Sequence, residues 1–230
     1  CHSGCGSKSG YWTEVKQPTS ISHTCFCESL YNDVMDEAKM VITDYSDVQK
    51  PKKLAAYLRA LFTFQTVNQG ELPRPGNSSD AKKVVERALI FFQENTRDLE
   101  PDESQKLMES TEQLLMTLAL GSKGSLNPMA ALFGGVVGQE IIKACSGKYL
   151  PINQWLHFES AKSLPRLWSR KDGPPVEEAD VQPLDCRYDG QIVVFGRSFQ
   201  HRLNSASVFL VGAGALGCEF LKNFAMVGLG

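Results

Sequence analysis

A glycine-rich segment near the C-terminus has residue types and spacing suited to phosphate binding. Gly212, Gly214 and Gly217 form a G-x-G-x-x-G pattern between an apolar run at residues 207–211 and an amphipathic run at residues 218–226. The first run predicts a buried parallel strand and the second predicts a helix. In that context Gly212 allows a tight turn, Gly214 lets the backbone approach a phosphate, and Gly217 lets helix and strand pack closely. The N–H groups at the helix start add a positive end to the site, so the pattern indicates nucleotide binding.

The sequence leaves the kind of nucleotide open. In dinucleotide-binding domains an acidic residue about 20 residues after the glycines binds the ribose. That position falls beyond Gly230. An NAD-dependent oxidoreductase and an ATP-using enzyme therefore both fit the glycine pattern.

Other residues that could carry chemistry give weaker signals. Seven cysteines cannot all pair within one chain, which favours a reducing compartment. Near the N-terminus the cysteines are spaced C-x3-C and C-x-C rather than C-x2-C, so no metal site is predicted. His157 has no nucleophile or carboxylate pattern beside it, and we expect it to be a structural histidine.

Three amphipathic stretches precede the glycine segment and predict helices. Their apolar residues recur at helical spacing within residues 54–62, 84–92 and 107–118. We expect Asp80 to cap the second helix and Gly121 to end the third in the left-handed conformation. Short breaks between such helices are typical of a small helical bundle.

A fourth helix, predicted from Asn127 as N-cap to just before Gly147, is apolar nearly all round and should therefore be buried. It contains Gly134, Gly135 and Gly138, which together cost about 2–3 kcal/mol relative to alanine. Close approach of another backbone would offset that cost.

The flanking regions give shorter predictions. Residues 1–10 predict no regular structure, residues 11–16 predict a short strand and residues 154–158 are a strand candidate. Residues 163–185 contain four prolines and mixed charges, which favours a linker.

Composition narrows the function classes. The chain of 230 residues is 42% hydrophobic and 22% charged, as expected of a folded protein rather than a disordered one. A formal net charge of -2 gives no basic excess, so we expect no nucleic-acid partner. No apolar run reaches the ~20 residues that a bilayer needs, so we expect no membrane partner.

Two long motif clusters resemble the ubiquitin-activating enzyme family. Residues 187–191 (RYDGQ) and 209–225 resemble the start of that family's active adenylation domain. Residues 127–148 and 154–156 resemble the end of its inactive adenylation domain. The helices before them resemble its four-helix bundle, and residues 11–18 resemble the end of its first catalytic-cysteine half-domain.

The resemblance implies a fold class and a domain order. The fold would be mixed α/β, a helical bundle followed by pieces of two ThiF-type Rossmann-like adenylation domains. The implied regions are the end of the first catalytic-cysteine half-domain (1–20), the four-helix bundle (21–125), the inactive adenylation domain's C-terminal part (126–162), a linker (163–186) and the active adenylation domain's N-terminal part (187–230). We expect a piece of a longer protein, since the chain begins at Cys1 and ends soon after the glycine motif.

The resemblance also implies an activity. ATP and Mg²⁺ would activate the ubiquitin C-terminus as an acyl-adenylate, and a cysteine elsewhere would form a thioester for transfer to conjugating enzymes in the cytoplasm and nucleus. Gly212, Gly214, Ala215 and Gly217 match the ATP loop, with Ala215 expected at a direct contact. The catalytic cysteine and the magnesium ligands match no position here, so the chain alone is expected to be inactive. Activation of another ubiquitin-like modifier and an NAD-dependent oxidoreductase remain the alternatives.

Overall fold

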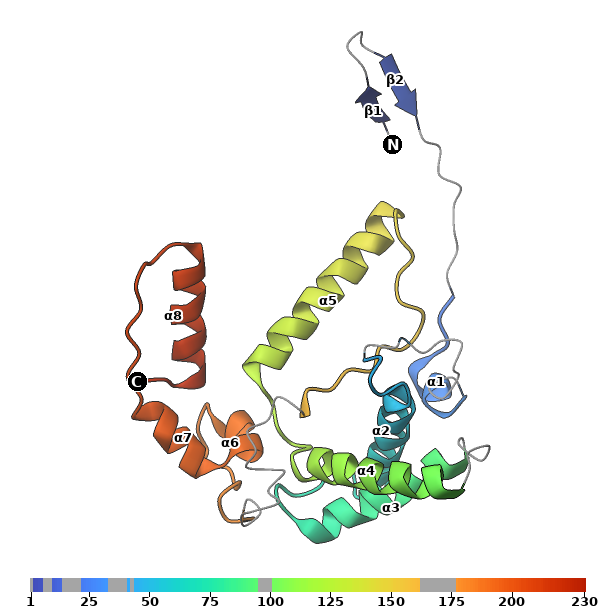
Figure 1. Cartoon of the computed structure of the whole chain (residues 1–230), viewed down its shortest axis with the longest axis vertical. Helices are drawn as coiled ribbons and strands as arrows, with labels where there is room; N and C mark the ends of the chain where they lie inside the picture. Colours follow the sequence, from blue (N-terminus) through green and yellow to red (C-terminus); the bar gives the residue numbers. More distant parts are fainter. Residues whose placement is uncertain are drawn as a thin grey trace.

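The computed structural model describes residues 2–5, 10–13, 22–32, 41, 44–94, 101–161 and 177–230. Figure 1 shows a group of packed helices, a long helix that projects from it, a smaller C-terminal group of helices beside it, and an N-terminal hairpin set apart. The elements are β1 (His2–Cys5), β2 (Gly10–Thr13), α1 (Phe26–Asn32), α2 (Lys50–Val67), α3 (Ser78–Glu94), α4 (Pro101–Leu120), α5 (Asn127–Ser146), α6 (Asp189–Phe195), α7 (Arg197–Asn204) and α8 (Ala215–Val227).

Helices α2, α3 and α4 form the bundle that the amphipathic pattern predicts. Their buried faces meet in one apolar cluster that includes Ala60, Val84, Ala88 and Leu115. Alanines in the cluster leave room for close packing of the helices, while the larger Leu115 and Phe92 are fully buried. The helical periodicity of the sequence therefore reports the core correctly.

The ends of two bundle helices differ from the sequence prediction. The cap of α3 is Asn77, whose side-chain oxygen accepts a hydrogen bond from the Asp80 backbone N–H at 3.0 Å. The Asp80 carboxylate instead accepts hydrogen bonds from Arg74, at 2.7 Å from Nε and 3.1 Å from Nη2. This pairing lowers the pKa of Asp80. Helix α4 ends at Leu120, directly before Gly121 as predicted, but the predicted left-handed conformation is wrong because Gly121 is absent from the glycines with positive φ.

Helix α1 is joined to the bundle and to the segment that follows α5, which we call the return segment (residues 150–161). Gln154 makes two hydrogen bonds with the Thr24 backbone, accepting from its N–H at 3.0 Å and donating to its carbonyl at 2.9 Å. The indole N–H of Trp155 donates to the Ser29 hydroxyl at 2.6 Å. On the bundle side, Phe26 packs edge-on against Phe62.

The return segment is also held at the start of α2. Lys50 is buried and forms ion pairs with Asp44 at 2.8 Å and with Glu159 at 2.7 Å. Removing a lysine from water is unfavourable unless its charge is balanced, and two carboxylates do that here. The return segment therefore lies across one end of the bundle. The strand predicted at residues 154–158 is not formed, since of these residues only Trp155 takes part in a single β-bridge.

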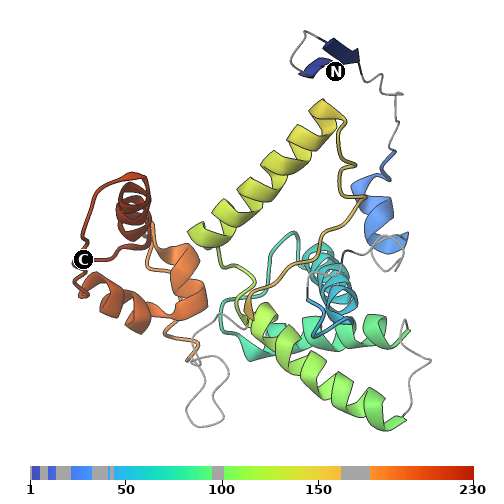
Figure 2. The ribbon, with the colours of Figure 1, turned by 45° about the horizontal axis from the view of Figure 1, so that its top comes forward.

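Helix α5 contradicts the expectation of burial. It has no buried residue, and Figure 2 shows it projecting away from the bundle. A Cβ added at Gly134, Gly135 or Gly138 would meet nothing within 4 Å, so no described backbone lies against this face. The start of the helix differs by one residue, since Leu126 is the N-cap and Asn127 is helical. The end is as predicted, with Gly147 in the left-handed conformation at φ 58°.

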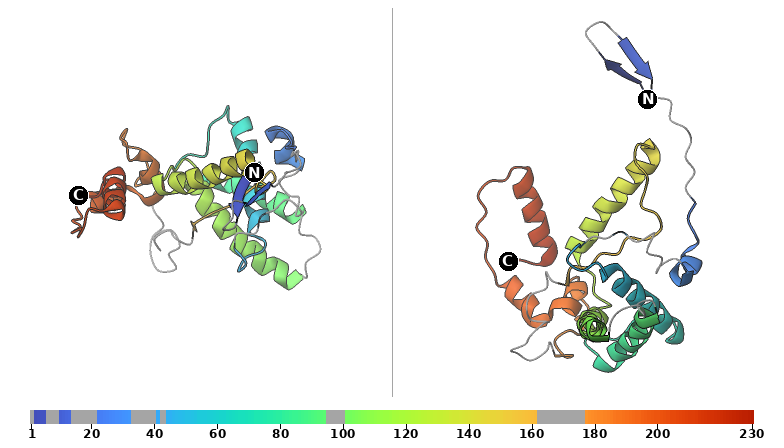
Figure 3. Two further views of the ribbon diagram at one scale, coloured as in Figure 1. Left: turned by 90° about the horizontal axis from the view of Figure 1, so that it is seen from above. Right: turned by 45° about the vertical axis from the view of Figure 1, so that its right-hand side comes forward.

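The strands also differ from the sequence prediction. Residues 2–5, expected to be irregular, pair antiparallel with residues 10–13, where Ser3 faces Trp12. The predicted strand at residues 11–16 is thus confirmed over 11–13, and its remainder lies outside the described residues. The right-hand view of Figure 3 shows this hairpin away from the helices. Because the hairpin is the only sheet in the described part of the chain, a mixed α/β fold is not confirmed.

Across the residues that the structure describes, no helix combines the length and the apolar character needed to cross a bilayer.

Replacing the buried Leu115 with alanine should destabilise the bundle. Leu115 is fully buried, so Leu115→Ala should lower the free energy of unfolding by roughly 2–5 kcal/mol through lost contacts and a residual cavity. Ile90 on α3 is 50% exposed, and Ile90→Ala should cost clearly less. Urea unfolding followed by circular dichroism measures both variants. Equal losses would contradict this assignment of the core.

Stability should fall below about pH 6.5 because of His157. This side chain is 2% exposed and stacks on Trp155, and burial lowers its pKa from 6.5 to about 4. Between those values the unfolded chain binds a proton that the folded chain excludes, so stability is full above pH 6.5 and is lost as the pH falls toward 4.

Melting temperatures measured at about pH 7.5 and 5 test this loss, since the window lies above the range of most carboxylates. His157→Gln should flatten the pH dependence. His201→Gln, which alters an exposed histidine on α7, should not. An unchanged slope in His157→Gln would refute the assignment.

Candidate functional site: the glycine loop of α8

The glycine loop has the backbone geometry that its spacing predicts at two of its three glycines. Gly212 has φ 92°, a conformation that side chains rarely adopt. A Cβ at Gly217 would overlap the carbonyl oxygen of Gly212 and lie 3.1 Å from the carbonyl carbon. Gly217 is also the one buried residue of α8. The loop therefore folds back on the first turn of α8, which only glycine at position 217 permits.

Gly214 differs from these two because space is open in front of it. Gly214 is the N-cap of α8, and a Cβ there would meet nothing within 4 Å. Ala215 starts the helix and is exposed. The first N–H groups of a helix lack partners within it, and they carry the positive end of its dipole. An exposed helix start beside an unobstructed glycine fits a phosphate group, so the four residues predicted from the sequence do lie together.

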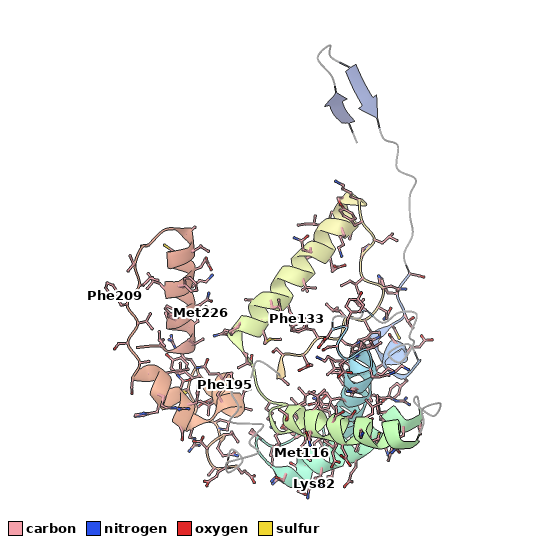
Figure 4. The ribbon with its side chains drawn as sticks, viewed as in Figure 1. Lys82, Met116, Phe133, Phe195, Phe209 and Met226 are labelled. Atoms are coloured by element: carbon pink, nitrogen blue, oxygen red, sulfur yellow. The ribbon has the colours of Figure 1, made fainter. Side chains whose placement is uncertain are left out.

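The predicted strand before the loop is not formed. Residues 207–211 have no strand assignment, and Phe209 and Val211 are 92% and 83% exposed. Figure 4 shows Phe209 on the outer side of this segment, away from α8. A parallel strand needs hydrogen-bonded neighbours on its edges, and the described part of the chain supplies none. The sequence prediction of a buried strand here is wrong for this chain.

Helix α6 joins the glycine-loop region to the bundle. The Ser125 backbone N–H donates to the Gly190 carbonyl at 2.9 Å. A Cβ at Gly190 would lie 2.6 Å from the Ser125 carbonyl oxygen, so the two backbones touch. The segment before α6 also contacts the bundle region. The side-chain amide of Gln182 donates to the Pro75 carbonyl at 3.0 Å, and the neighbouring Val181 is fully buried.

The C-terminal end of α8 lies in a polar site that we call the helix socket, formed by Arg187, Gln191, Gln200 and Asn127. Arg187 Nη2 donates to the Ala225 carbonyl at 2.6 Å. The Val227 carbonyl accepts from the side-chain amides of Gln191 at 2.7 Å and Gln200 at 3.2 Å. Asn127, the first residue of α5, donates to the Met226 carbonyl at 3.4 Å.

These bonds satisfy carbonyls that a helix leaves unpaired at its end. Gln191 and Gln200 are 8% and 5% exposed, and they hydrogen-bond to each other. Gly228 follows in the left-handed conformation at φ 79°, so close to Tyr188 that a Cβ would lie 2.7 Å from its ring. Sequence reasoning missed the socket, although its RYDGQ segment was one of the clusters that carry the resemblance.

Exposed cysteines and potential metal ligands are other chemistry-bearing residues in the part of the chain that the structure describes. Among the described residues no group of three or more His, Cys, Asp or Glu side chains could hold a metal ion. Cys218 sits on the first turn of α8, where its thiol donates to the Ala213 carbonyl at 3.4 Å. Cys186 is likewise exposed, and its thiol donates to Asp189 at 3.3 Å. Both thiols thus have local hydrogen-bond partners.

Two known protein families match this chain, one over the helical bundle and one over the region of the glycine loop. Residues 17–90 match the family described as ubiquitin-activating enzyme E1 four-helix bundle. Residues 188–230, which contain α6, α7 and the glycine loop, match the ThiF family. The two family matches therefore indicate a helical bundle joined to part of a Rossmann-like adenylation domain of the ThiF type.

Individual proteins resemble the chain along nearly its whole length. Ubiquitin-activating enzyme E1 2 of Arabidopsis thaliana is 41% identical over 96% of the chain and 19% of its own length. Ubiquitin-activating enzyme E1 1 of Candida albicans is 40% identical over 97% of the chain and 20% of its own length. Ubiquitin-like modifier-activating enzyme 7 of Mus musculus is 41% identical over 97% of the chain and 21% of its own length.

By these matches the chain resembles ubiquitin-activating enzymes along nearly its whole length, in agreement with the motif clusters. The chain spans about a fifth of the length of the curated relatives it matches.

Alanine at Gly217 should disturb the first turn of α8, whereas alanine at Gly214 should not. Gly217→Ala should disturb the first turn, because its methyl group would overlap the Gly212 carbonyl, and overpacking of this kind costs about 1–3 kcal/mol. Gly214→Ala should leave the turn intact, because nothing lies within 4 Å of the added carbon. Amide hydrogen exchange at residues 215–221 measures both. Similar exchange in the two variants would contradict the loop geometry.

Proposed function

We propose that this chain is part of an enzyme that uses ATP to adenylate the C-terminus of ubiquitin. The carboxylate oxygen would bond to the α-phosphorus of ATP, and pyrophosphate would leave. The acyl group would then pass to a cysteine outside this chain as a thioester and on to a ubiquitin-conjugating enzyme. The observation that carries the proposal is the order of parts, an E1-type bundle followed by a ThiF-family glycine loop with open space at Gly214.

In this proposal Gly212, Gly214, Ala215 and Gly217 lie against the nucleotide. Gly212 and Gly217 shape the turn, and Gly214 leaves room for a phosphate beside the start of α8. Ala215 contributes the first helical N–H group. Mg²⁺ would neutralise charge on the ATP phosphates, and its protein ligands would come from outside the described residues. The enzyme would act in the cytoplasm and the nucleus.

Substitution into a relative tests the proposal. The chain would replace the matching segment of the Arabidopsis enzyme, and ubiquitin-dependent exchange of pyrophosphate into ATP would be measured. We expect exchange with the chimera and none with the chain alone, which lacks positions that match the magnesium ligands. Gly214→Ala in the chimera should preserve folding but abolish most of the exchange, since its methyl group would occupy the phosphate space.

An inactive but folded chimera would refute the proposal. Tight binding of NAD with no effect of ATP would instead favour the oxidoreductase alternative, because both cofactors use the same kind of glycine loop.

A second candidate is the activation of another ubiquitin-like modifier. The mouse relative, whose name specifies a ubiquitin-like modifier, is as similar to the chain as the Arabidopsis relative is, at 41% identity each. A parallel chimera in the mouse protein separates the two candidates. Activity in the mouse background alone would favour the second candidate, and activity in the Arabidopsis background would favour ubiquitin.

A further inference from the structure

Helix α8 is attached to the rest of the chain at one end only. Its long apolar side chains are exposed, including Leu216 at 78%, Phe220 at 51% and Leu221 at 51%. Apolar packing along the sides of α8 therefore contributes little to its position. Its C-terminal carbonyls, in contrast, accept hydrogen bonds from side chains of three other parts of the chain.

The donors in the helix socket are suited to hold this end in one orientation. Gln191 and Gln200 converge on the same carbonyl, Val227, from α6 and α7. The guanidinium of Arg187 adds a positive charge at the negative end of the helix dipole. Because consecutive carbonyls lie about 100° apart around the helix axis, bonds to Ala225, Met226 and Val227 restrict rotation as well as position.

The socket is in turn fixed to the bundle. Gln191 belongs to α6, whose residue Gly190 touches the backbone of Ser125. Gln200 belongs to α7, and α7 begins where the Asp180 carboxylate accepts from the Ser198 N–H at 3.0 Å and from its hydroxyl at 2.8 Å. A continuous path of close contacts and hydrogen bonds thus leads from the bundle through the socket and along α8 to the glycine loop.

We propose that Arg187, Gln191 and Gln200 are positioning residues for nucleotide binding. Their hydrogen bonds hold the C-terminal end of α8. This fixes the position at which the glycine loop, at the other end of α8, contacts the phosphates of ATP. The inference rests on the proposed function, since it assigns the socket to the same ATP site. None of the three residues touches the nucleotide in this proposal.

Amide hydrogen exchange on the full chain tests whether the socket residues hold the C-terminal end of α8. The double variant Gln191→Met and Gln200→Met keeps the length of both side chains but removes the amide donors to Val227. Amides of α8 should exchange about tenfold faster or more, because the partly buried Val227 carbonyl loses both side-chain partners. Amides of α2–α4 should exchange as before, which shows in the same sample that the bundle is folded. Gln113→Met, the same change on an exposed position of α4, is the matched control.

The Arabidopsis chimera tests the link to the nucleotide. The double variant should raise the KM for ATP several-fold and leave the KM for ubiquitin unchanged. Arg187→Met should do the same, and Arg187→Lys should recover part of the effect because it keeps a cation at the helix end. A loss of stability alone would lower activity without this selective change in the KM for ATP.

Unchanged α8 exchange in the double variant would overturn the proposal. Faster α8 exchange with an unaltered KM for ATP would overturn it as well, because the socket would then stabilise the helix without positioning the loop. Inactivity of the chimera with the unaltered chain would count against the proposed function, and α8 exchange would still decide whether the socket holds the helix.

Discussion

The backbone contact between Ser125 and Gly190 determines where the glycine loop lies relative to the bundle. The Ser125 N–H donates to the Gly190 carbonyl. The two backbone segments are so close that a Cβ at position 190 would clash with the Ser125 carbonyl oxygen. This contact sets the position of α6, α6 contributes Gln191 to the socket, and the socket holds α8. A lateral shift at Gly190 would therefore move the glycine loop at the far end of α8.

Two kinds of interaction stabilise the two halves of the structure. The bundle is held by apolar side chains buried in one cluster, an interaction without directional preference. The C-terminal part buries Val181, Ile192 and Val193 and adds directed hydrogen bonds that involve Asp180, Gln182 and Gln191. Directed bonds fix angles better than apolar contacts do, which suits a part of the chain that must present a loop in a defined orientation.

Helices α5 and α8 differ from the bundle helices because their apolar side chains are largely exposed. Both are strongly apolar, yet α5 has no buried residue and α8 has only Gly217. Their amino-acid composition is that of buried helices, whereas the described part of the chain covers neither. The chain spans about a fifth of the length of the curated relatives it matches.

The sequence by itself determined the features that depend on neighbouring residues. Helical periodicity placed α2, α3 and α4, and glycine spacing identified the turn at Gly212 and the close contact at Gly217, because both are set by backbone geometry over a few residues. Tertiary structure alone decided that Asp80 pairs with Arg74, that residues 207–211 form no strand, and that Gln191 and Gln200 hold Val227. Each of these depends on which groups the fold brings within hydrogen-bond distance, and local sequence patterns carry no record of such partners.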